Sequence, residues 1–129
     1  MISFGRDVVG NLKIASKKEW LVTNGIGGYS SSTIIGWNTR RYHGLLVAAT
    51  RPPLGRMVLL SKLEEVIGIK GTSYLLSTNR YPKTIHPQGY LYMQQFKQDP
   101  FPKFTYSIED IILEKEIFMV TGENTTVVT

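Results

Sequence analysis

Apolar and polar residues alternate along much of this chain, and the clearest example is the stretch 103–109, which reads Lys-Phe-Thr-Tyr-Ser-Ile-Glu. Side chains of a β-strand point alternately to the two faces of a sheet, so this period of two predicts a strand with one buried and one solvated face. Segments rich in Val, Ile, Thr and Tyr predict further strands over residues 19–24, 29–37, 42–50, 57–60, 63–70, 72–77, 90–97 and 111–121.

Turn-forming residues separate these segments, and no segment keeps an apolar stripe at helical spacing over the ten or so residues that a helix needs. At this length a single core can bury roughly two thirds of the unfolded surface. We therefore predict an all-β fold, an antiparallel β-sandwich, in one domain over residues 1–129. The predicted turns lie at Gly25, 27–28, Asn38, 52–55, Gly71, Asn79, 87–89 and 99–102.

The last residues predict a strand, a tight turn and the opening of a return strand. Residues 111–121 are followed by Gly122-Glu123-Asn124 and then by the β-prone run 125–129. A domain that stopped inside its last strand would leave an open sheet edge. We therefore expect this chain to be a truncated part of a longer domain.

The net charge of +5 is unevenly distributed along the chain. Residues 1–60 hold eight Lys or Arg against two acids, whereas residues 107–129 hold one against five. The basic half could attract phosphate or an acidic partner surface, but it makes only a weak case for nucleic acid, and we expect no nucleic-acid partner. With no cysteine and no apolar run of about eighteen residues, we expect a cytoplasmic protein with no membrane partner.

The glycine-rich run 24–29 resembles a dinucleotide-binding loop only superficially. Ser30 stands where that fingerprint needs its last glycine, and the residues that follow are β-prone rather than helical. We expect these glycines to supply positive φ angles or to allow another backbone to come close. A sugar-contacting glycine loop is the alternative.

The least ordinary segment is 36–44, where large polar and aromatic groups stand between two strands. Aromatic faces cover the C–H patches of sugar rings, and forked polar groups meet sugar hydroxyls in pairs. The alternative is structural: one arginine pairs with Glu19, Glu64 or Glu65, the other is solvated, and Trp37 and Tyr42 pack in the core. The candidate substrate-binding residues are Trp37, Asn38, Arg40, Arg41, Tyr42 and His43.

No convincing catalytic or metal constellation is present. The two histidines, His43 and His86, have no second ligand at a suitable spacing, so we expect no metal and no cofactor. The neighbouring acids of 64–65 and 109–110 point to opposite faces of a strand, and Glu114 and Glu116 resemble a solvated surface. A glycosidase drawn from distant acids such as Asp99, Glu64 and Glu114 stays an alternative, but we predict no catalytic residue.

Six blocks of the sequence together resemble the N-terminal domain of bacterial and archaeal glycogen debranching enzymes of the amylo-α-1,6-glucosidase type. The blocks are residues 20–29, 31–36, 38–48, 52–56, 58–65 and 113–119. The resemblance implies a β-sandwich of the supersandwich kind that precedes an (α/α) barrel, whose carboxylates hydrolyse the α-1,6 branch points of glycogen-like glucans. This chain has no trace of that barrel, and Trp37 departs from the family pattern.

These observations lead to two expectations about function. The first is a non-catalytic N-terminal domain of a glycoside hydrolase in glycogen catabolism, which contacts α-glucan or docks on the C-terminal catalytic domain. The alternative is a structural docking or oligomerisation domain with no sugar site, which would show an apolar patch rimmed by Arg40, Arg41 and Lys62. Homo-oligomerisation is left open.

Overall fold

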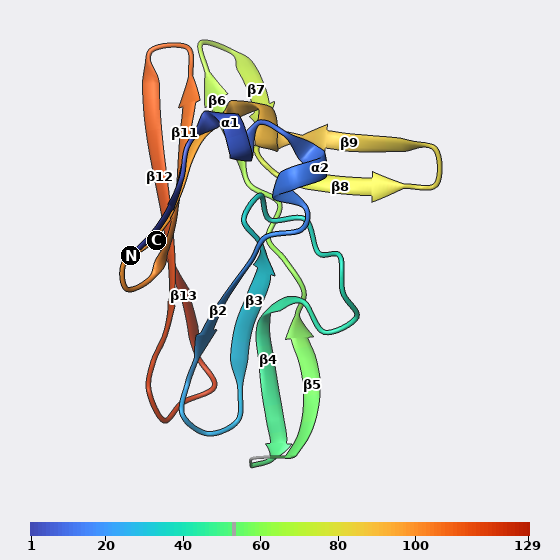
Figure 1. Ribbon diagram of the computed structural model, residues 1–129, viewed down its shortest axis with the longest axis vertical. Coiled ribbons are helices and arrows are strands. Elements are labelled where there is room, and N and C mark those ends of the chain that lie inside the picture. Colours follow the sequence, from blue (N-terminus) through green and yellow to red (C-terminus); the bar gives the residue numbers. More distant parts are fainter. Residues whose placement is uncertain (53) are drawn as a thin grey trace.

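The computed structural model describes residues 1–52 and 54–129 and consists mainly of antiparallel strands (Figure 1). The larger of its sheets joins the first residues of the chain to its C-terminal third. In the described residues its strand order is β1 (Ile2–Phe4), β10 (Met93–Gln98), β11 (Pro102–Ile108), β12 (Ile111–Met119) and β13 (Thr126–Val128).

The second sheet is a meander in which each strand pairs with the next along the chain. Two separate hairpins, β6–β7 and β8–β9, follow it and lie at the other end of the molecule (Figure 1). Pro53, part of the predicted turn 52–55, lies outside the described residues. The meander consists of β2 (Glu19–Thr23), β3 (Tyr29–Thr33), β4 (Gly44–Arg51) and β5 (Leu54–Leu60); the hairpin strands are β6 (Val66–Ile69), β7 (Thr72–Leu75), β8 (Thr78–Tyr81) and β9 (Thr84–Gln88).

The strands form because their apolar residues recur with a period of two. Buried and half-buried residues alternate without a break along β11, and along β2 the alternate residues Trp20 and Val22 are buried. The strand predicted from residues 103–109 is therefore confirmed. Such a pattern fixes how each strand pairs with its neighbours, because a shift of the pairing by one residue would turn every apolar side chain to the solvent.

The two sheets pack face to face through an aromatic cluster. The rings of Trp20 on β2 and Phe104 on β11 meet edge to face with their centroids 6.1 Å apart, and Phe96 meets Phe104 at 5.2 Å. The indole N–H of Trp20 donates a hydrogen bond of 3.0 Å to the carbonyl of Thr33, so its polar atom is satisfied inside the core. Burying each such ring stabilises the fold by about 2–3 kcal/mol. The predicted all-β sandwich is confirmed.

Three short helical segments were not predicted. They are α1 (Arg6–Val9), α2 (Leu12–Ala15) and the 3₁₀ turn η1 (Gly89–Tyr92), and each has only four residues. One turn cannot show a helical period; α2 instead depends on the side chain of Asn11, which accepts a hydrogen bond of 3.2 Å from the Ile14 amide. Nowhere in the part of the chain described here is a helix long and apolar enough to cross a membrane.

The hairpin β8–β9 was also missed by the sequence analysis. Its strands are largely exposed, and Pro87 stands within β9. A proline removes one donor from the ladder and argues against a strand, so neither periodicity nor composition indicated this hairpin.

Candidate functional site

The segment between β3 and β4 begins with a turn that ends β3 earlier than predicted. Gly36 has a φ of +75°, and the hydroxyl of Thr33 accepts from the Trp37 amide at 2.9 Å and donates to the Trp37 carbonyl at 2.8 Å. The side chain of Trp37 is half-buried and packs against the core. The structural interpretation of Trp37 is therefore confirmed.

Asn38 uses its side-chain amide to connect two parts of the fold. Its Oδ1 accepts a hydrogen bond of 2.6 Å from the hydroxyl of Ser32 on β3. Its Nδ2 donates to both the carbonyl and the hydroxyl of Ser61, each at 3.1 Å, just after β5 ends. Because the amide is engaged in this way, Asn38 holds the loop in place.

His43 is almost fully buried, and its two ring nitrogens have different roles. Its Nδ1 accepts hydrogen bonds from the backbone amides of Thr39 at 2.9 Å and Arg40 at 3.2 Å. An accepting Nδ1 carries no proton, so the geometry assigns the neutral tautomer with the proton on Nε2. That nitrogen donates to Oε1 of Glu19 at 2.5 Å. His43 thus closes the loop upon itself and ties it to the first residue of β2.

Glu19 receives a second hydrogen bond at the same oxygen, from Nε of Arg40 at 2.6 Å. Burial raises the pKa of Glu19, but the hydrogen bonds from Arg40 and His43 outweigh it, so the pKa lies below the ordinary value for glutamate. The prediction that one arginine pairs with an acid is confirmed for this pair. Sequence reasoning did not identify Glu19 as the residue that also orients His43; the pairing of Glu19 with Thr33 at the ends of β2 and β3 brings it there.

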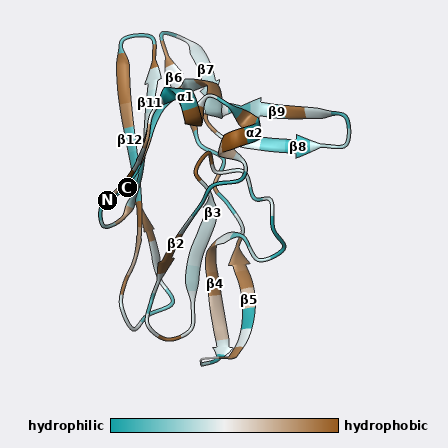
Figure 2. Ribbon diagram, in the orientation of Figure 1, coloured by the Kyte–Doolittle hydropathy of each residue, from teal (hydrophilic) through white to brown (hydrophobic). Residues whose placement is uncertain are grey.

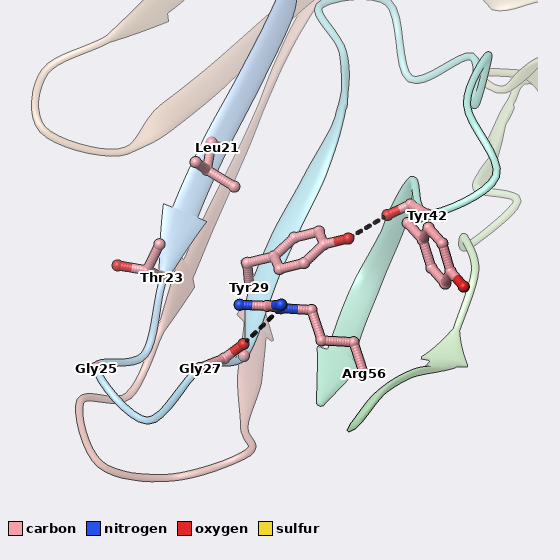
Figure 3. A pocket seen from close by; sticks show the side chains of 8 residues that line it. Leu21, Thr23, Gly25, Gly27, Tyr29, Tyr42 and Arg56 are labelled. Atoms are coloured by element: carbon pink, nitrogen blue, oxygen red, sulfur yellow. Dashed lines mark hydrogen bonds between the residues drawn. The ribbon is translucent and has the colours of Figure 1, made fainter. Parts of the chain in front are cut away.

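Arg41 and Tyr42, like Arg40, have exposed side chains. The guanidinium of Arg41 lies over the ring of Tyr42, 5.3 Å from its centre, and the ring is 47% exposed. The expectation that Tyr42 packs in the core is therefore wrong. Its backbone, rather than its ring, is held: the Tyr29 hydroxyl donates to the Tyr42 carbonyl at 2.9 Å (Figure 3). Burial raises the pKa of Tyr29 above the ordinary tyrosine value.

An open cleft lies along the outer face of β2 and β3, beside these two residues. One part has a volume of about 840 Å³, and an adjoining part of about 720 Å³ shares Leu21, Tyr29 and Tyr42 with it. Figure 3 shows Arg56 beside Tyr29, where its Nε donates to the carbonyl of Gly27 at 3.1 Å. The second part extends toward Glu19, Arg40, Arg41 and His43.

The floor of the first part is the glycine turn between β2 and β3. Gly25 and Gly27 have φ angles of +83° and +92°, and a Cβ at Gly28 would lie only 2.5 Å from Nδ2 of Asn24. The side chain of Asn24 is fully buried, and its Oδ1 accepts from the amides of Ile26 and Gly28, both at 3.0 Å. As predicted, Gly25 and Gly27 adopt positive φ angles, and Gly28 lets neighbouring atoms come closer than a side chain would allow.

Asn24 also links this turn to the turn between β12 and β13. Its Nδ2 donates to the Glu123 carbonyl and to Oδ1 of Asn124, both at 3.0 Å, and its own carbonyl accepts from the Gly122 amide at 2.7 Å. One buried amide therefore fixes the end of the cleft against the opposite sheet.

A comparison of the sequence with models of known protein families shows to which family this chain belongs. The family model described as "Glycogen debranching enzyme N terminal" matches residues 18–129, which include all of β2 to β13 and the segment 36–44. The chain belongs to this family. No curated protein and no solved structure matched the chain.

In this debranching-enzyme N-terminal domain, the six candidate residues fall into two groups. Trp37, Asn38 and His43 face inward and shape the loop. Arg40 shares its guanidinium between Glu19 and solvent, whereas Arg41 and Tyr42 face the cleft. The structure thus separates the residues that build the segment from those whose side chains face the open cleft.

Proposed function

We propose that this domain is a non-catalytic module of a debranching enzyme, which contacts α-glucan through the cleft along β2 and β3. The supporting observation is that Tyr29, Tyr42 and the arginines Arg41 and Arg56 line adjoining parts of one open cleft. A tyrosine ring can cover the C–H face of a glucose unit, while guanidinium groups donate to its hydroxyls. The glycine turn also lines this cleft.

The carboxylates of the domain support a role without hydrolysis. A glycosidase needs two carboxyl groups about 5 to 9.5 Å apart across its cleft. Among the described residues, Glu19 is the acid that lines the cleft, and its Oε1 is engaged by Arg40 and His43. Glu64 and Glu114, named above as distant candidates, bind Asn79 and Lys103 instead.

Docking on the glucosidase domain is the second candidate for the same face. Leu21, at the centre of the cleft, is 53% exposed although it lies in the middle of a strand. An exposed leucine beside an exposed tyrosine suits a protein surface as well as a sugar ring. The two candidates differ in what binds the isolated chain.

A titration with maltoheptaose separates these candidates. We expect saturable binding that Tyr42→Ala and Arg41→Ala each weaken about five- to tenfold, which is close to 1–1.4 kcal/mol. Tyr81→Ala and Arg80→Ala are the matched controls, because both side chains are exposed on β8, away from the cleft. If all four variants bind the sugar with the same affinity, the site does not lie in this cleft. No binding at millimolar sugar leaves docking as the function of the face.

A further inference from the structure

The outermost strand of the meander, β5, exposes a row of apolar side chains. It stands at the end of the order β2-β3-β4-β5, and among the described residues no strand pairs with its outer edge. The fraction exposed is 68% for Leu54, 53% for Met57, 56% for Leu59 and 40% for Leu60. Figure 2 shows β5 mostly hydrophobic, interrupted by a hydrophilic band. A long apolar edge of this kind is a template for another strand.

The two faces of β5 differ in chemistry. Arg56 lines the cleft and pairs with Ala49 on β4, whereas its neighbour Met57 pairs with Ala48. Successive strand residues point to opposite faces, so Met57 lies on the face away from the cleft. Because Met57 is half-exposed there, the opposite sheet leaves this end of the inner face uncovered.

The surroundings of β5 carry positive charge that the domain does not neutralise. The sequence has no acidic residue between Glu19 and Glu64, a range that contains all of β3, β4 and β5. Arg51 and Arg56 are exposed, and neither forms an ion pair within the described residues. A partner that covered this edge with acidic side chains would meet no repulsion from it.

We propose that the edge of β5 binds an extended strand of a partner protein, in which apolar and acidic side chains alternate. The backbone of that strand would extend the sheet, which is the usual mode of strand addition. Its apolar side chains would lie on the face of Met57, and its acidic side chains on the face of Arg56. A strand of about seven residues, or roughly 24 Å, matches the length of β5.

A second copy of this chain suits the same edge less well. Two β5 strands paired about a two-fold axis would place the Arg51 and Arg56 groups of both copies along one acid-free ribbon. Like charges at such an interface oppose association. The positive charge of β3 to β5 therefore favours an acidic strand over self-pairing. The inference does not require glucan binding, because the backbone edge of β5 and Met57 lie outside the cleft, and Arg56 is the residue of β5 that the two proposals share.

The test uses hydrogen exchange of β5 amides in the full chain, with a synthetic peptide of about seven residues that alternates Glu and Val. We expect the peptide to protect amides within 54–60, and a Lys/Val peptide of equal length to protect none. Met57→Lys should weaken protection at least tenfold, and its matched control Ile112→Lys, an exposed apolar strand residue on β12, should leave it unchanged. Arg56→Glu should reverse the preference toward the Lys/Val peptide.

Binding too weak to detect with the free peptide is tested with a fusion, in which the Glu/Val peptide follows the C-terminus after a linker of about twenty Gly/Ser residues. Such a linker spans roughly 25 Å and gives the peptide a millimolar effective concentration. If neither the free nor the tethered peptide protects 54–60, the proposal is wrong. It is equally wrong if the two peptides protect β5 alike. Sedimentation of the free chain as a dimer that Met57→Lys dissociates would show that a second copy occupies the edge instead.

Discussion

Two ion pairs of the same length occupy opposite environments in this domain. Glu19 meets Arg40, and Glu65 meets Lys115, each with 2.6 Å between oxygen and nitrogen. The side chain of Arg40 is 71% exposed at the rim of the cleft, whereas that of Lys115 is 17% exposed and its ammonium lies 4.8 Å from the centre of the Phe104 ring. Distance alone therefore does not say what a pair contributes; burial decides it.

The interior pair connects the segment after β5 to the opposite sheet. Burial lowers the pKa of Lys115, but the Tyr106 hydroxyl and the Glu65 carboxylate beside it outweigh that effect, so the pKa lies above the ordinary lysine value. The rim pair, by contrast, shares its carboxylate with His43 and fixes a loop. The interior pair ties the segment after β5 to the larger sheet, and the rim pair shapes one side of the open cleft.

The largest effect is expected from Glu65→Gln, because it leaves the ammonium of Lys115 buried without a counter-charge. The free energy of unfolding should fall by about 3–5 kcal/mol, measured by urea denaturation near neutral pH. Glu114→Gln is the matched control, since its partner Lys103 is half-exposed, and it should cost less than about 1 kcal/mol. Equal losses for the two variants would contradict the contrast between interior and surface pairs.

Asn24→Ala should have the next largest effect. It removes the side-chain hydrogen bonds to the two turns and leaves the Ile26 and Gly28 amides without their acceptor. We expect a loss of about 2–3 kcal/mol in the free energy of unfolding, together with faster hydrogen exchange of both amides. Gln95→Ala, which removes a single exposed hydrogen bond, is the control and should change little. Undisturbed exchange at Ile26 and Gly28 would show that the turn does not depend on Asn24.

His43→Phe keeps an apolar ring in place but removes the acceptor for the Thr39 and Arg40 amides. We expect a loss of about 1–2 kcal/mol and faster exchange at these two amides, while the amides of β11 keep their protection. His86→Phe, on the exposed strand β9, is the control. A rigid loop in His43→Phe would mean that Asn38 and the turn at Gly36 hold the segment without the histidine.

Arg40→Ala should have the smallest effect, at most about 1 kcal/mol. The pKa of Glu19 lies below its ordinary value, so its ion pair stabilises the fold above roughly pH 4.3 and loses that contribution as the pH falls through the folded pKa. The difference in unfolding free energy between the natural chain and Arg40→Ala should therefore shrink toward zero in acid, and also in high salt. A difference that persisted at pH 2 would assign the effect of Arg40 to packing.

The pattern of apolar and polar residues was sufficient to predict the sandwich, because every second residue is buried along strands such as β11. It was also sufficient for the glycine turn and for the pairing of one arginine of the segment with an acid, but it did not indicate that this arginine is Arg40. The direction of Tyr42 could not be predicted, since an aromatic residue at the start of a strand is found on either face. In the fold, Tyr42 lies in the turn before β4 with its ring exposed, and its backbone carbonyl accepts from Tyr29, a contact that only the folded sheet brings about.

The interior position of Lys115 was equally hidden. Glu114 and Glu116 on either side suggested a solvated surface, and only the alternation of β12 against the core turns the lysine between them inward. The one-turn helices α1 and α2 have too few residues for a periodic signal and depend on local capping. Sequence periodicity thus defines layers well, whereas single side-chain directions depend on contacts across the sheets.

Amide chemical-shift mapping of the chain titrated with maltoheptaose tests most directly whether the cleft along β2 and β3 contacts α-glucan. We predict saturable shifts for Leu21, Tyr29, Arg41, Tyr42 and Arg56, with the amides of the β8–β9 hairpin unchanged. Tyr42→Ala should reduce these shifts without altering the rest of the spectrum. Shifts confined to another face, or none at millimolar sugar, would contradict a glucan site in this cleft.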